Sequence, residues 1–60
     1  MGKRLTELRG ERSLRTVAKA IGVTESALSN YESGIRVPRE DIKAAIANYY
    51  NRPVQSIFFT

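Results

Sequence analysis

The sequence predicts an all-α fold, a compact bundle of five short helices in a single domain over residues 1–60. Apolar residues recur along the chain at the spacing i, i+3 and i+4, which is typical of helices that bury one face. Glycines follow three of these segments, at positions 10, 22 and 34, where they are common stop signals for a helix. A chain of 60 residues buries a modest share of its surface, so dimerisation would help to stabilise it.

Two of the predicted helices, residues 14–21 and 25–33, are separated only by residues 22–24. Gly22 can adopt a positive φ, which lets the chain turn sharply, and Thr24 is a good N-cap for the following helix. Helices joined by so short a turn cross at a steep angle, as in a helix–turn–helix. Their inward faces consist of Leu14, Val17, Ala18 and Ile21 on the first helix and Ala27, Leu28 and Tyr31 on the second.

The other three helices are predicted from shorter patterns. The first covers residues 1–9 and turns Leu5 and Leu8 inward. The fourth opens at residues 39–41, with acidic side chains in its first turn as the helix dipole prefers, and closes at residues 51–52. The fifth covers residues 53–58, with Pro53 at its first position. The inward residues of the fourth helix are Ile42, Ala45, Ile46 and Tyr49, and the apolar residues of the fifth are Val54, Ile57 and Phe58.

The outward face of the helix over residues 25–33 carries short polar side chains. A solvated helix normally carries residues of higher helix propensity, so the serines and the Asn favour contact with a ligand. Short donors and acceptors suit the edges of DNA bases, and Asn30 could make a bidentate contact with adenine. Glu25 has two interpretations, because it suits the helix dipole and could also accept a hydrogen bond from cytosine N4. The candidate base contacts are Glu25, Ser26, Ser29 and Asn30.

The charge of the chain favours an anionic partner. Ten Lys and Arg against six Asp and Glu give a net charge of +4. Basic residues, Arg9 and Arg12 among them, crowd the first third of the chain and the loop after residue 33, and both regions should border the helix over residues 25–33. The N–H groups at the start of the helix over residues 14–21 can bind a phosphate, or Ser13 could simply cap that helix. The candidate phosphate contacts are Ser13, Arg15, Ser33, Arg36 and Arg39, with solvated arginines as the alternative.

The chain contains no Cys and no His. A disulfide framework, a thiolate metal site, a zinc finger and a Ser-His-Asp triad are therefore excluded. The carboxylates are scattered and so small a chain could hardly enclose a substrate pocket, so we expect no enzyme, no cofactor, no metal and no small-molecule ligand. Nothing resembles a signal peptide or a transmembrane segment, which predicts a cytoplasmic protein without a membrane partner. Binding to DNA would associate such a protein with the nucleoid.

The central residues resemble the helix–turn–helix of phage repressor and Cro-type proteins, the xenobiotic-response-element family. The small, glycine and apolar positions of that motif fall on Val17, Ala18, Gly22, Val23, Leu28 and Tyr31. Residues 31–34, YESG, look like its ending of hydrophobe-Glu-x-Gly, and Arg36 and Pro38 follow. Residues 51–59 resemble its short closing helix, so the resemblance covers nearly the whole chain.

This resemblance implies a lambda-repressor-like fold and a transcriptional regulator, a repressor of phage or bacterial type. Such a protein binds a palindromic double-stranded DNA operator as a homodimer, with the second helix of the motif in the major groove. The resemblance also implies a structural ion pair between Glu32 and an Arg of the first helix. Arg9 is the candidate partner, and Arg12 is the alternative because the connection between Leu8 and Val17 is shorter than in the family.

The C-terminal end carries more apolar surface than one small core easily covers. We expect a two-fold dimer through this end, with Val54, Ile57 and Phe59 in the interface. The alternative function is a protein-binding module, such as an antitoxin or an adaptor. Its working surface would be Tyr49, Tyr50 and the two terminal phenylalanines.

Overall fold

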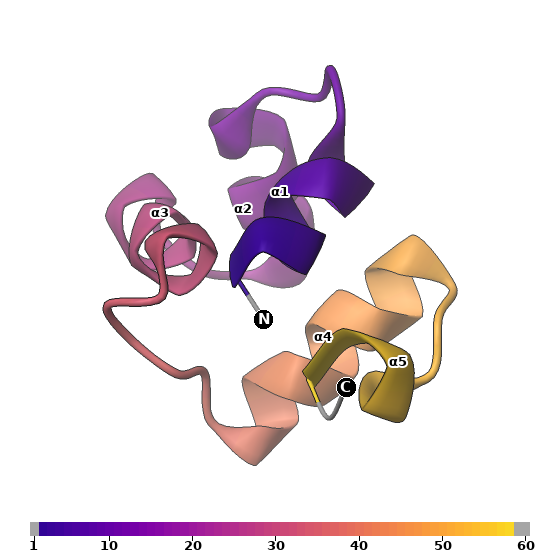
Figure 1. Ribbon diagram of the computed structural model, residues 1–60. Coiled ribbons are helices and arrows are strands. Elements are labelled where there is room, and N and C mark those ends of the chain that lie inside the picture. The colour runs from indigo at the N-terminus through magenta and orange to yellow at the C-terminus, as the bar shows by residue number, and fades with distance from the viewer. Residues whose placement is uncertain (1, 59–60) are drawn as a thin grey trace.

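In the computed structural model, which describes residues 2–58, the chain folds into α-helices joined by short turns and loops (Figure 1). The helices in this range are α1 (Gly2–Arg9), α2 (Leu14–Ile21), α3 (Glu25–Ser33), α4 (Glu40–Tyr50) and α5 (Val54–Phe58). No strand is present between residues 2 and 58. The prediction of an all-α bundle of five short helices is confirmed.

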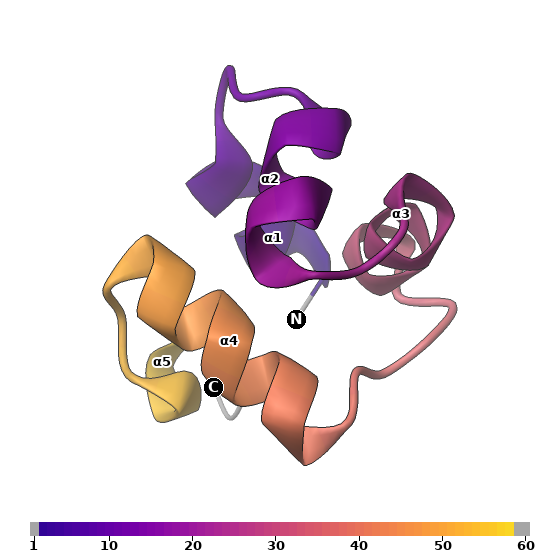
Figure 2. The same ribbon diagram turned by 180° about the vertical axis from the view of Figure 1, so that it is seen from behind.

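The helices are arranged so that α3 lies at one side of the molecule and α5 at the other (Figures 1 and 2). α1 packs against α3, α2 packs against both α3 and α4, and α4 packs against α5. The domain measures 25 × 23 × 21 Å along its principal axes. α3 is therefore supported by α1 and α2 and still lies at an edge of the domain, where a large partner can reach it.

The predicted bounds of α2 and α3 match the structure, whereas the start of α5 does not. α5 begins at Val54, so the prediction that Pro53 is its first residue is wrong. The carbonyl oxygen of Pro53 accepts hydrogen bonds from the N–H and the hydroxyl of Ser56, at 3.1 and 3.0 Å, so Pro53 precedes the helix as its cap. The predicted first residue of the chain's first helix, Met1, lies outside the described residues.

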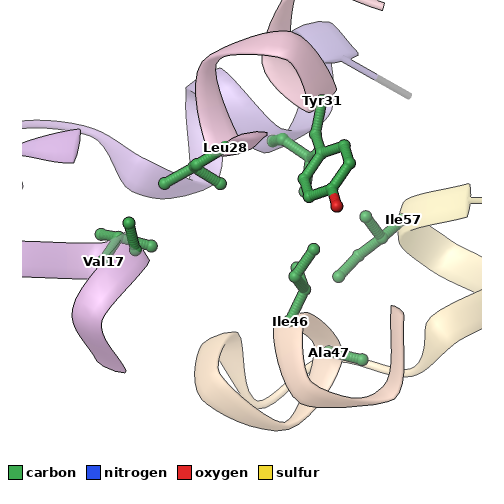
Figure 3. Close-up of a cluster of buried hydrophobic side chains, with 8 residues drawn as sticks. Val17, Leu28, Tyr31, Ile46, Ala47 and Ile57 are labelled. Atoms are coloured by element: carbon green, nitrogen blue, oxygen red, sulfur yellow. The ribbon is translucent and has the colours of Figure 1, made fainter. Parts of the chain in front are cut away.

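Side chains from all five helices meet in one core (Figure 3). The largest fully buried side chains, one from each helix, are Leu5, Val17, Leu28, Ile46 and Ile57. Tyr31 of α3 points toward Ile46 and Ile57, and so links the central helix pair to α4 and α5. Because α2 and α3 both contribute to this shared core, their relative orientation is fixed by packing.

The burial of Ile57 corrects its assignment to a dimer interface. Its side chain is 1% exposed and lies in the core of the monomer, where a second copy of the chain cannot contact it. Val54 is half-buried against the same core, and Phe59 lies outside the described residues. Phe58 also packs against the core, with the ammonium of Lys43 5.6 Å from its ring centre. Much of the apolar surface expected at this end is therefore used inside the domain.

The turn between α1 and α2 contacts the C-terminal end of α4 through Arg12. Its guanidinium lies 5.6 Å from the ring centre of Tyr49 and 5.8 Å from that of Tyr50, and the two rings meet edge to face at 5.1 Å. Cations and aromatic rings attract each other at such distances. The hydroxyl of Tyr50 is buried, and no group within residues 2–58 forms a hydrogen bond with it.

We expect Tyr50→Phe to raise the free energy of unfolding by about 1 kcal/mol, because it removes a buried hydroxyl that has no partner. Burial raises the pKa of Tyr50, so the folded state favours the neutral phenol. The raised pKa therefore makes the stability depend on pH. The stability is unaffected below the unfolded pKa of about 10, and it falls as the pH rises through the folded pKa of Tyr50. Urea denaturation between pH 7 and 11 should therefore show a weaker alkaline loss of stability in Tyr50→Phe. Tyr49→Phe, the matched control, should keep it, and an equal loss in both variants would contradict this account.

Candidate nucleic-acid interface

The turn between α2 and α3 is held by backbone hydrogen bonds and two side-chain caps. Gly22 adopts the left-handed conformation, with φ 96°, and its N–H donates to the carbonyl of Ala18 at 2.8 Å. The N–H of Val23 donates to the same carbonyl at 3.0 Å. The hydroxyl of Thr24 then accepts the N–H of Ala27 at 3.0 Å and so starts α3. The direction in which α3 leaves the turn is thus well determined.

The C-terminal half of α3 is tied to α1 by an ion pair between Arg9 and Glu32. Arg9 Nε donates to Glu32 Oε2 at 2.8 Å, and the side chain of Glu32 is only 8% exposed. The hydrogen bond to Glu32 raises the pKa of Arg9. Arg9 Nη1 also donates to the backbone carbonyl of Arg12 at 2.7 Å. Arg9 is therefore the partner of Glu32, and the alternative, Arg12, contributes only its carbonyl to this network.

The start of α1 approaches the end of α3 closely. A Cβ atom placed on Gly2 would overlap the carbonyl oxygen of Glu32, so the position needs a residue without a side chain. The hydroxyl of Thr6 donates to the carbonyl of Gly2 at 3.1 Å and lies 3.4 Å from Glu32 Oε1. α1 therefore contacts both the backbone and the carboxylate of Glu32, and these contacts fix the end of α3 against α1.

The outward face of α3 carries the four candidate base contacts. Glu25 and Ser26, at the start of the helix, are exposed, whereas Ser29 and Asn30 are half-buried. Ser33, a candidate phosphate contact, is exposed at the end of the helix. None of these five side chains forms a hydrogen bond within residues 2–58. Their donors and acceptors are available to a ligand, and the caps and ion pairs of the fold do not use them.

The loop between α3 and α4 brings two candidate phosphate contacts to the helix pair. Arg36 and Arg39 are exposed and line one hollow together with Gly22, Val23 and Tyr31. The N–H groups of residues 35 and 36 both donate to the carbonyl of Asn30, so they are unavailable to a phosphate. The two arginine side chains remain candidate phosphate contacts in this loop.

The start of α2 carries the other candidate phosphate contacts, Ser13 and Arg15. The hydroxyl of Ser13 accepts the N–H of Thr16 at 3.1 Å and donates to its hydroxyl at 2.8 Å, so Ser13 acts as the N-cap. Arg15 is exposed and lines a hollow with Lys19, Thr24 and Glu25. Lys19 was not a candidate from the sequence, although its spacing of four residues from Arg15 places both side chains on one face of α2.

Two of the basic residues in the first third of the chain have structural roles. Arg9 binds Glu32, and Arg12 lies over the rings of Tyr49 and Tyr50. Arg9 therefore borders α3 as expected but is used in an ion pair, whereas Arg12 lies against α4, which corrects the expectation that it borders α3. The basic residues that line hollows beside the helix pair are Arg15 and Lys19 in one hollow and Arg36 and Arg39 in another.

Two features are absent from the described part of the chain. Residues 2–58 contain no group of three or more Asp and Glu side chains placed to hold a metal ion. Over the same residues, no helix has the length and apolar character needed to cross a membrane.

A comparison with protein families matches residues 1–56 of this chain to the helix-turn-helix domain. The chain belongs to this family. Its helix–turn–helix is α2 and α3, joined at Gly22. This membership supports the resemblance to Cro- and repressor-type proteins and a role as a DNA-binding transcription regulator. No curated protein and no solved structure matches the chain significantly.

Proposed function

We propose that this helix-turn-helix protein is a sequence-specific repressor of phage or bacterial type, which binds a palindromic operator as a homodimer. α3 lies in the major groove, where Glu25, Ser26, Ser29 and Asn30 contact base edges. The observation that carries the proposal is the outward face of α3, whose polar side chains form no hydrogen bonds within residues 2–58. Basic side chains line two hollows beside α3, one with Arg15, Lys19 and Glu25 and the other with Arg36, Arg39 and Tyr31.

The distribution of charge suggests that affinity and specificity come from different residues. α3 itself carries two acidic residues and no basic one, so the helix that enters the groove does not supply the attraction. Arg15 of α2, and Arg36 and Arg39 after α3, are exposed and can reach the phosphates that line the groove. Phosphate contacts of this kind fix the register of the protein, and base contacts then select the sequence.

The size of the domain favours binding as a pair. Successive major grooves on one face of a duplex are about 34 Å apart, whereas the longest dimension of the domain is 25 Å. One copy therefore reaches one half-site, and a palindrome requires two. We propose that the two copies meet at the α5 end through Val54 and Phe59, without Ile57, because Ile57 is buried inside each copy.

A binding titration against duplex DNA at several salt concentrations tests this function. If the protein neutralises phosphates, the logarithm of the affinity should fall linearly with the logarithm of the salt concentration, by about 0.9 per phosphate. Arg36→Ala should weaken binding to every sequence alike and reduce this slope by about 0.9, because it removes one phosphate contact. An affinity for duplex DNA that does not depend on salt would contradict the proposal.

Arg52→Ala is the matched control for this titration. Arg52 is exposed like Arg36, but it lies between α4 and α5, where it lines a hollow with Asn51 and Val54. The two variants make the same change in charge at opposite sides of the domain. We expect Arg52→Ala to leave the salt slope unchanged, and an equal effect of both variants would mean that only the net charge matters.

A further inference from the structure

A hollow between α2 and the start of α3 holds side chains of opposite charge. It is lined by Arg15, Ala18, Lys19, Val23, Thr24 and Glu25. Lys19 and Arg15 come from α2, and Glu25 is the first residue of α3. All three charged side chains are exposed, and neither Lys19 nor Glu25 forms an ion pair within residues 2–58. An unpaired carboxylate and an unpaired ammonium thus line the same hollow.

This arrangement changes what Glu25 can do in a DNA complex. Phosphates on both sides of the major groove would repel an isolated carboxylate at the tip of α3. The cationic side chains beside it on α2 offset that repulsion, so the carboxylate can approach a base edge. The stabilising effect of Glu25 on the helix dipole does not require a cation on the neighbouring helix.

A carboxylate next to an ammonium complements one kind of base pair in the major groove. Cytosine offers its N4 donor at one side of a C·G pair, and guanine offers the acceptors O6 and N7 at the other. In an A·T pair the N6 donor lies between two acceptors, which would repel a carboxylate that binds it. A C·G pair therefore presents one donor, which a carboxylate such as Glu25 can bind, followed by two adjacent acceptors, which an ammonium such as Lys19 can bind.

We propose that Lys19 and Glu25 jointly read one C·G base pair in each half-site. Glu25 accepts a hydrogen bond from cytosine N4, and Lys19 donates to N7 and O6 of the guanine paired with it. The inference rests on the proposed function, because it requires α3 to lie in the major groove. It adds a residue of α2 to the specificity determinants of the domain and predicts one position of the operator.

The test uses a site selected by the wild-type protein from random duplex DNA, with single atoms changed at its C·G positions. Replacing guanine by 7-deazaguanine removes N7 and keeps the base pairing. At one C·G position this change should weaken binding by the wild-type protein about five-fold or more. The Lys19→Ala variant should bind the site with guanine and the site with 7-deazaguanine equally well. Glu25→Ala should lose the preference for cytosine at that position, and Lys19→Arg should keep the sensitivity to 7-deazaguanine.

The outcomes separate this inference from the function on which it rests. If Lys19→Ala weakens all sequences alike and remains sensitive to 7-deazaguanine, Lys19 contacts a phosphate and the inference is overturned. A consensus without a C·G pair that responds to Glu25→Ala also overturns it, while sequence-specific binding stands. If no duplex is bound at any salt concentration, the proposed function itself fails. We expect thermal denaturation to give the same melting temperature for each variant as for the wild type, because Lys19 and Glu25 are exposed.

Discussion

Arg9→Ala should lower the free energy of unfolding by about 2–3 kcal/mol. The substitution leaves the carboxylate of Glu32 largely buried, with only the hydroxyl of Thr6 nearby, at 3.4 Å. A domain of this length has a total stability of roughly 3–9 kcal/mol, so the loss is a large fraction of it. Urea denaturation followed by circular dichroism measures the effect directly.

Two further variants make this experiment specific. Arg4→Ala is the matched control, because Arg4 is exposed on the same helix, and it should change the stability by less than about 0.5 kcal/mol. Glu32→Gln should cost less than Arg9→Ala, because Arg9 then keeps its hydrogen bond to the carbonyl of Arg12 and no buried carboxylate remains. If Arg9→Ala were as mild as Arg4→Ala, the ion pair would not be what holds α3 against α1.

The second large effect concerns DNA recognition. Asn30→Ala should reduce the discrimination between the best operator and its single-base variants by about 1–3 kcal/mol at one position, because a bidentate contact with adenine is lost. Its side-chain amide forms no hydrogen bond within residues 2–58, so the fold should tolerate the change. Competition binding with a set of single-base operator variants measures the discrimination.

Asn48→Ala is the control for this experiment, since Asn48 is exposed on α4 and lines the hollow beside α5. We expect it to leave both the affinity and the base preference unchanged. A uniform loss of affinity for all operator variants in Asn30→Ala would show that Asn30 positions the helix and does not read a base. Weakening of nonspecific binding alone would assign Asn30 to the phosphates.

Local signals were sufficient to predict the central helix pair. Ser13 and Thr24 cap α2 and α3 as their positions suggest, and the glycines at 22 and 34 end both helices with positive φ. Such caps act within one turn of the chain, so the sequence alone contains them. The same reasoning placed the start of α5 one residue too early, because Pro53 precedes the helix and its carbonyl accepts hydrogen bonds from Ser56.

Contacts between distant parts of the chain were harder to predict. In the sequence, Arg9 and Arg12 were both possible partners of Glu32. Only the packing of the turn between α1 and α2 shows that Arg9 binds Glu32 and that Arg12 contacts two tyrosines. The burial of Ile57 depends on how α5 returns to the core, which an apolar pattern over five residues does not determine. The proximity of Lys19 to Glu25 likewise follows from the crossing of α2 and α3.

The loop after α3 shows a feature that the sequence pattern did not single out. Ile35 and Val37 are 77% and 64% exposed, and they are the large apolar side chains most open to solvent within residues 2–58. They alternate with Arg36, whereas Pro38 is buried. In a chain this small the loop cannot both cross between α3 and α4 and place every apolar side chain in the core.

The central claim is that a rigid turn presents α3 to duplex DNA between two pairs of basic side chains. The most direct test is selection of bound sites by the wild-type protein from a pool of random duplex oligonucleotides. The account predicts a symmetric consensus of two half-sites whose centres are about 34 Å, or one turn of the helix, apart. Recovery of sequences with no common motif would contradict it.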